Sequence, residues 1–326
     1  MDTGTHVVMG IALGGLATLD PVVANDPLLP TAVIAATIIG SQAPDFDTIL
    51  KLKNNAVYIR NHRGVTHSVP ALFTWPLLIT GGITLFTGTE NWHTILLWSL
   101  IAVFLHVFVD IFNAYGTQAL RPFSHKWIAL GVINIFDPFI FISHLVALFL
   151  WFSGYPPGPT MLILYCVLIV YYSWRALAKR HVVKLAKSAH PDASHIFVSP
   201  TINWSQWHVV IRTPSMLYVT ECKSGSFEYF EKYAFDPIPD TPVLNAAKQD
   251  ANLGAFLSFS PTYRWEIVEK DNVTEVRFVD LRYRSKGHYP FVAIVQLDED
   301  LSIINSYTGW VFSEEALQKK LNIVLQ

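Results

Sequence analysis

The chain has 326 residues, of which 52% are hydrophobic and only 15% charged, and its mean hydropathy is +0.35. This composition is too apolar for an ordinary soluble protein and indicates a membrane protein. The net charge of −2 gives no support to a nucleic-acid partner. The two cysteines, Cys166 and Cys222, fall in different halves without metal-binding spacing, which excludes a zinc finger and argues against a disulfide.

The first half of the chain consists of apolar runs separated by short polar breaks. We count about six helical membrane segments, at residues 7–19, 28–43, 69–86, 92–112, 132–152 and 159–174. Several are shorter than the roughly 20 residues that a helix needs to cross a bilayer. We therefore expect an α-helical membrane domain over residues 1–176 in which some segments are short or partly re-entrant.

The distribution of lysine and arginine predicts the orientation of these segments. Basic residues occur in the breaks at residues 44–68, 113–131 and 175–187. The alternate breaks, at residues 20–27, 87–91 and 153–158, contain neither lysine nor arginine. By the positive-inside rule, the chain is a multi-pass protein of the cell membrane with both termini in the cytoplasm.

The sequence pattern changes after the last apolar run. Residues 177–194 are basic and predict a helical linker that could lie against anionic headgroups. From residue 195 to residue 326, hydrophobic and polar residues alternate with period two, as in strands. We expect a small, mainly antiparallel β-rich domain in the cytoplasm.

The stretch at residues 61–68, N-H-R-G-V-T-H-S, places two histidines, an arginine and two hydroxyl groups directly before an apolar run. His62 and His67 are candidate metal ligands, and the fork of donors on Arg63 suits carboxylate or phosphate. The alternative is an interfacial basic loop that touches headgroups. We favour a metal site, because histidine and arginine are costly near hydrocarbon and are usually functional there.

His106 and Asp110 lie one helical turn apart in H-V-F-V-D and therefore share a helix face. Both side chains could reach one cation. The alternative is a hydrogen-bonded pair that only holds helices together. The position inside a membrane segment favours a functional role, since burying these groups in hydrocarbon is costly.

Three further carboxylates and one histidine complete the set of candidates. Asp45 and Asp47 occur in P-D-F-D, where we expect an extended or turn geometry with both carboxylates on one side. They could instead form an Asx-turn or helix cap. His6 lies at the start of the first segment and is a candidate only because the other candidate ligands are expected on the same membrane face. Asp137 could orient a metal ligand by a hydrogen bond, act as a general base, or cap the helix of the next segment.

The motifs T-H, P-D-F-D, N-H-R-G-V-T-H-S and H-V-F-V-D together resemble the bacterial membrane-bound metal-dependent hydrolase family that contains the YdjM and YfhP proteins. Their order fits the YfhP-like branch, over about residues 1–175. A more distant similarity is to the zinc-dependent phospholipase C and P1-nuclease group, whose helical folds use clustered metals on phosphodiesters. The resemblance implies metal ligation at His6, Asp45, His62, His67, His106 and Asp110.

The sequence thus predicts a membrane-bound hydrolase that acts on phosphoesters at the cytoplasmic interface. Zinc is the expected divalent metal, with manganese or iron as alternatives. The site's depth suggests a phospholipid or lipid-linked substrate. Arg63 would stabilise developing charge, and Asp47 or Asp137 would act as general base.

Two other functions remain open at this point. In the first, the membrane half anchors a β domain that binds a protein partner, and the His/Asp cluster is a structural metal clamp. In the second, His106 and Asp110 relay metal ions or protons in a transporter. A transporter requires polar residues to continue across the membrane, and the later segments offer few.

Overall fold

The computed structural model describes residues 1–270, 273–285 and 287–323. Contacts between residues divide the chain into two compact units. The first unit contains Met1–Asp47, His62–Arg180 and Pro200–Trp204. The second contains Thr48–Asn61, His181–Ser199 and the chain from Ser205 onward.

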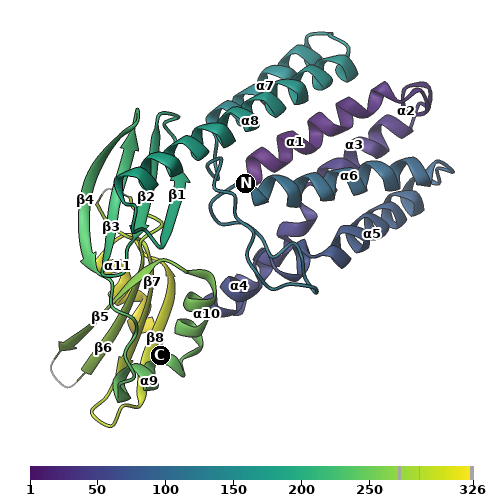
Figure 1. The fold of residues 1–326 in the computed structure, drawn as a ribbon. Helices are drawn as coiled ribbons and strands as arrows, with labels where there is room; N and C mark the ends of the chain where they lie inside the picture. Colours follow the sequence, from purple (N-terminus) through teal and green to yellow (C-terminus); the bar gives the residue numbers. More distant parts are fainter. Residues whose placement is uncertain (271–272, 286, 324–326) are drawn as a thin grey trace. The chain divides into compact units, whose positions relative to one another are not determined.

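The first unit is helical, and its longer helices lie side by side (Figure 1). Its helices are α1 (Thr3–Leu16), α2 (Pro21–Asn25), α3 (Leu29–Gly40), α5 (Val69–Thr87), α6 (Trp92–Ile111), α7 (Pro138–Phe152) and α8 (Pro157–Ala189). Of these, α5, α6 and α8 are long and apolar enough to cross a membrane. The apolar helices α1, α3 and α7 have only 14, 12 and 15 residues. At about 1.5 Å per residue they are shorter than the roughly 30 Å hydrocarbon core.

Two glycines bring α1 close to α3, which places the start of α1 beside the polar cluster described below. A Cβ atom added to Gly10 would lie 2.9 Å from the Cα atom of Ile38. A Cβ atom at Gly14 would lie 2.9 Å from the Cα atom of Ile34. Small residues allow this close approach of helix backbones, which apolar membrane helices use for packing.

The expected segment at residues 132–152 was wrong at its start. The helix α7 begins only at Pro138, where Asp137 caps it by accepting hydrogen bonds from the amides of Phe139 and Ile140. The residues directly before it are neither helix nor strand, and Val132 N donates to Phe112 O over 2.7 Å. A proline at the first helical position, preceded by an aspartate cap, fixes the start of a helix more strongly than hydropathy does.

The second unit contains two small antiparallel sheets, where the sequence predicts a single mainly antiparallel domain. The first sheet is formed by β1 (His195–Pro200), β2 (Gln206–Arg212), β3 (Met216–Lys223) and β4 (Ser226–Ala234), in that order. The second is formed by β5 (Tyr263–Lys270), β6 (Val273–Asp280), β7 (Phe291–Leu297) and β8 (Ile303–Trp310), also in that order. The helices α9 (Pro242–Lys248), α10 (Ala251–Phe259) and α11 (Glu314–Ile323) accompany the second sheet.

A short helix from the first half of the chain also belongs to the second unit. This is α4 (Asn55–Asn61), which packs with α10 and β8. Ile59 packs against the buried cluster of the second sheet, and Asn55 Nδ2 donates to Thr308 O over 3.2 Å. The chain therefore leaves the first unit after Asp47 and returns to it at His62.

Candidate metal centre

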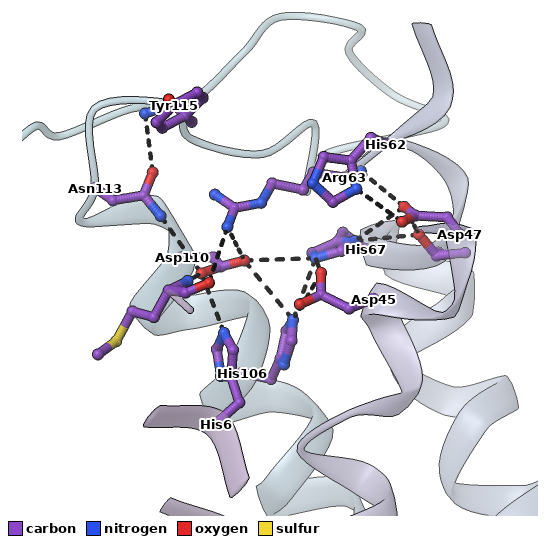
Figure 2. A network of polar contacts seen from close by, with 12 residues as sticks. His6, Asp45, Asp47, His62, Arg63, His67, His106, Asp110, Asn113 and Tyr115 are labelled. Carbon is purple, nitrogen blue, oxygen red and sulfur yellow. Dashed lines mark hydrogen bonds and ion pairs between the residues drawn. The ribbon is translucent and has the colours of Figure 1, made fainter. Parts of the chain in front are cut away.

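Polar side chains from separate elements of the first unit converge on one cluster (Figure 2). His6 is on α1, Asp45 and Asp47 are in the 3-10 helix Ala43–Leu52, His62 and Arg63 follow α4, His67 ends the 3-10 turn Val65–His67, and His106 and Asp110 are on α6. Most of these side chains are buried. Asp45, at 19% exposed, and His62, at 25%, mark the more accessible side of the cluster.

Four ligand atoms in the cluster lie at the spacing expected around a metal ion. The Nε2 atoms of His67 and His106 are 3.3 Å apart. Asp45 Oδ1 lies 3.6 Å from the first of these nitrogens and 3.7 Å from the second. Asp110 Oδ2 lies at the same two distances, 3.6 Å and 3.7 Å. Ligand atoms bonded at about 2.1 Å to a tetrahedral zinc ion lie about 3.4 Å apart. Each of the five distances given above differs from this value by no more than about 0.3 Å.

The hydrogen bonds around the two histidines leave both Nε2 atoms with a free lone pair. His106 Nδ1 lies 2.6 Å from the carbonyl oxygen of Ser41, which only accepts, so this nitrogen carries the proton. Thr66 Oγ1 donates to Asp47 Oδ2 over 2.7 Å and therefore accepts from His67 Nδ1 at 3.1 Å. Metal-ligating histidines usually donate their other N–H in this way.

The carboxylates and their charge state fit the same interpretation. Asp45 Oδ1 and Asp110 Oδ2 are both buried, and Asp110 Oδ2 is paired with Arg63 Nη2 at 3.1 Å. Burial lowers the pKa of His67, so its imidazole is neutral. Burial alone would raise the pKa of Asp45, but neighbouring groups, including the permanently charged Arg63, hold it below its usual value, so Asp45 is a carboxylate. Two neutral imidazoles and two carboxylates can therefore hold a divalent cation.

His6 and Arg63 both lie against Asp110. The ring of His6 stacks on that of His106 with centroids 3.8 Å apart, and its Nε2 is 3.4 Å from Asp110 Oδ1. The main-chain amine of Met1 contacts the same oxygen. Arg63 Nη2 is 3.1 Å from Asp110 Oδ2. Arg63 has a φ of 58°, an unusual value for a residue with a side chain, and such strain often accompanies function.

Asp47 organises the loop instead of lying open to substrate. Its Oδ1 accepts from His62 Nδ1 at 2.7 Å. Its Oδ2 accepts from Arg63 N at 2.8 Å and from Thr66 Oγ1 at 2.7 Å. Asp45, Asp47 and His62 also offer ligand atoms within 4.8 Å of one another, which makes them a second, more exposed candidate group. In this structure, however, the hydrogen bonds of Asp47 chiefly fix the positions of His62, Arg63 and Thr66.

We expect Asp47→Asn to weaken metal binding by about 10- to 100-fold, as changes behind a ligand usually do. The amide cannot accept hydrogen bonds at both positions, so Thr66 would no longer fix the ring of His67 as it does here. Titration against a chromophoric chelator would measure the loss. Asp20→Asn, at the exposed cap of α2, is the matched control and should leave the affinity unchanged. Equal affinities in Asp47→Asn and the unaltered protein would contradict this role.

Asp137 performs the capping role that its sequence leaves open. Its Oδ1 accepts from Phe139 N at 3.0 Å and from Ile140 N at 3.3 Å. Its Oδ2 accepts from the hydroxyl of Tyr171 at 2.8 Å. Both carboxylate oxygens of Asp137 are therefore engaged in hydrogen bonds with α7 and α8.

Sequence reasoning missed the carbonyl of Ser41 and the hydroxyl of Thr66 as groups that orient the two histidines. A backbone carbonyl has no sequence signature, so nothing could have indicated Ser41. The position of Thr66 beside His67 was visible, but its bond to Asp47 depends on the fold of the loop. Asn113, by contrast, can be predicted from its place after Asp110 as a residue that orients ligands, and its Nδ2 donates to Asp110 Oδ1 at 3.4 Å.

These features define a membrane protein with a buried His/Asp cluster that could hold a metal ion. Residues 1–182 match the model of the YdjM inner membrane protein family, and the chain belongs to that family. Residues 191–233 match the YfhP middle domain, and residues 242–321 match the YfhP C-terminal alpha/beta plait domain. The resemblance inferred from the motifs is thereby confirmed.

The similarity to one relative extends over the whole chain. The chain is 57% identical, over 324 residues, to the uncharacterized protein YfhP of Bacillus subtilis (strain 168). The matched region covers 99% of each protein. No solved structure matches the chain.

Proposed function

We propose that this protein is a membrane-bound, metal-dependent hydrolase of phosphoesters, with a lipid or lipid-linked substrate at the cytoplasmic face of the cell membrane. The chain crosses the membrane several times with both termini in the cytoplasm. The observation that supports a metal-binding site most strongly is the close spacing of His67 Nε2, His106 Nε2, Asp45 Oδ1 and Asp110 Oδ2. Zinc suits this mixture of nitrogen and oxygen ligands, and manganese or iron are alternatives.

When bound, a divalent ion would supply the Lewis-acid chemistry that activates water and polarises a phosphoryl group. The chain's own residues prepare the site for it. Ser41 and Thr66 fix the two imidazoles, so little rearrangement is needed on binding. Asp47 holds the loop in place and positions Arg63 through the backbone amide.

Arg63 is the residue best placed to recognise a phosphoester. Its guanidinium lies beside Asp110, and its permanent charge and planar fork of donors match phosphoryl oxygens. A fixed cation of this kind stabilises the negative charge that develops during phosphoester hydrolysis, because it needs no reorganisation in the transition state. In this role Arg63 increases the rate of hydrolysis and does not contribute to metal binding.

A structural metal clamp is the second candidate function, and one observation favours it. The cluster supplies four protein ligand atoms, and three of the four residues are fully buried. Structural zinc sites are usually closed by four protein ligands, whereas catalytic sites keep an open position. In the hydrolase, the open position would lie on the side marked by the partly exposed Asp45 and His62.

The two candidates can be separated with protein purified in mild detergent without chelators. Metal content would be measured by mass spectrometry, and activity with bis-p-nitrophenyl phosphate and with phospholipid in mixed micelles. A hydrolase is expected to contain stoichiometric metal and to lose turnover when the metal is chelated. Stoichiometric metal that supports no turnover on either substrate indicates the clamp. A folded protein that binds no divalent ion contradicts both.

A further inference from the structure

An apolar cavity of about 470 Å³ lies among α1, α6, α7 and α8 of the first unit. The proposed chemistry does not use it. Its lining includes Met9, Leu105, Phe112, Leu168 and Ala176. Apart from a few polar groups, its walls are aliphatic and aromatic, which excludes a charged or strongly hydrated ligand.

The cavity adjoins the candidate metal centre through two helices. Thr5 and Val109 line the cavity, and the residues that follow them, His6 and Asp110, belong to the cluster. Successive residues on a helix point about 100° apart. The same turns of α1 and α6 therefore present one face to the cavity and a neighbouring face to the cluster, so one ligand could reach both.

The cavity is elongated along the helices. On α8 its lining extends from Tyr165 to Ala176, which are 11 residues apart, or about 16 Å at 1.5 Å per residue. The lining residues Phe108 and Ile169 are 44% and 67% exposed on α6 and α8, two of the helices long enough to cross a membrane. A chain could therefore enter sideways from the hydrocarbon of the bilayer.

His144 gives the cavity one unpaired polar group. Its side chain is 1% exposed, and its Nδ1 donates to Ile140 O over 2.7 Å. Its Nε2 is therefore an acceptor, and it has no hydrogen-bond partner within residues 1–270, 273–285 and 287–323. Leaving a buried acceptor without a donor is destabilising. A ligand that brings a hydroxyl or amide N–H would remove this cost.

We propose that this cavity binds one hydrocarbon chain of a membrane amphiphile whose headgroup reaches the metal centre. His144 accepts a hydrogen bond from a hydroxyl or amide of the same molecule. The headgroup chemistry rests on the proposed function, whereas the chain site rests on the cavity alone. The amphiphile is held by its chain inside the protein and not only by the surrounding bilayer.

Photocrosslinking tests the chain site without requiring activity. The full-length protein would be placed in nanodiscs containing a phospholipid with a diazirine in its acyl chain, irradiated, and digested for mass spectrometry. We expect peptides that contain Met9 and Tyr165 to be labelled at least about fivefold more than the exposed face of α5. Equal labelling of the cavity peptides and of α5 would overturn the proposal.

A matched pair of variants on α8 sharpens the test. Ala176 and Ala178 are both half-buried, but only Ala176 lines the cavity. Ala176→Trp should reduce cavity labelling severalfold, whereas Ala178→Trp should not. His144→Phe preserves the aromatic volume and should abolish any preference for a hydroxyl-bearing probe over its deoxy analogue. Unchanged labelling in Ala176→Trp, or an unchanged probe preference in His144→Phe, contradicts the assignment.

The result also distinguishes the chain site from the proposed function. Localised labelling of the cavity in a protein that hydrolyses no phosphoester leaves the chain site in place and removes the hydrolase. Metal-dependent hydrolysis with uniform labelling of all lipid-facing helices removes the chain site and leaves the hydrolase.

Discussion

His106→Gln is expected to bind a divalent ion more than about 100-fold more weakly than the unaltered protein. The change removes one of the four ligand atoms of the centre, the Nε2 that lies 3.3 Å from His67 Nε2. Changes behind a ligand already cost about 10- to 100-fold in affinity, so loss of the ligand itself should exceed that range. Competition with a chromophoric chelator, followed by metal analysis of the purified protein, measures the effect.

The chain offers a control for this variant on the same helix. His93 lies in the first turn of α6, is exposed, and belongs to neither candidate ligand group. His93→Gln should leave metal content and affinity unchanged. If His106→Gln and His93→Gln retain the same stoichiometric metal, the four-atom centre described here is not where the ion binds.

Arg63→Lys is expected to lower kcat for phosphoester hydrolysis by about 100- to 1000-fold while leaving metal content intact, as loss of a charge-stabilising donor does in other enzymes. Lysine retains the charge but lacks the fixed fork of the guanidinium. It also faces the same φ of 58° at this position, so backbone strain is similar in both proteins. Initial rates at saturating substrate, measured on metal-loaded protein, give the comparison.

Arg60→Lys is the matched control for Arg63→Lys, because Arg60 is exposed at the end of α4 and lies outside the cluster. It should change neither rate nor metal content. If Arg63→Lys instead loses the metal, Arg63 acts by stabilising Asp110, to which it is paired at 3.1 Å. Full activity in Arg63→Lys would remove Arg63 from the proposed chemistry.

The apolar helices were the most predictable part of the fold. Uniform hydropathy identified α5 and α6 closely. The ends of α5 also agree with local signals, because Ser68 and Pro70 lie at its start and Gly88 ends it in a left-handed conformation. Hydropathy failed before α7 because the largely buried, non-helical residues there are as apolar as a helix. It also gave no signal for α4, whose partners on α10 and β8 lie about 200 and about 250 residues later in the sequence.

Most residues of the cluster could be named from the sequence, but their arrangement within it could not. Helical spacing placed His106 and Asp110 on one face, and their ligand atoms lie 3.7 Å apart. The P-D-F-D stretch, for which the sequence predicts an extended or turn geometry, is part of a 3-10 helix. Asp45 therefore faces the metal centre while Asp47 faces the loop, a distinction that depends on backbone geometry and not on residue type.

Because residues 48–61 belong to the second unit, a shortened protein that keeps only the helical half would also lose contacts of its own residues. Ending the chain after α8 would remove the strands and helices against which Asn55 and Ile59 are seated. The helix α4 would lose its packing partners, although it connects Asp47 to His62 in the cluster. A fragment restricted to the helical half would therefore retain α4 without the residues of α10 and β8 that it packs against.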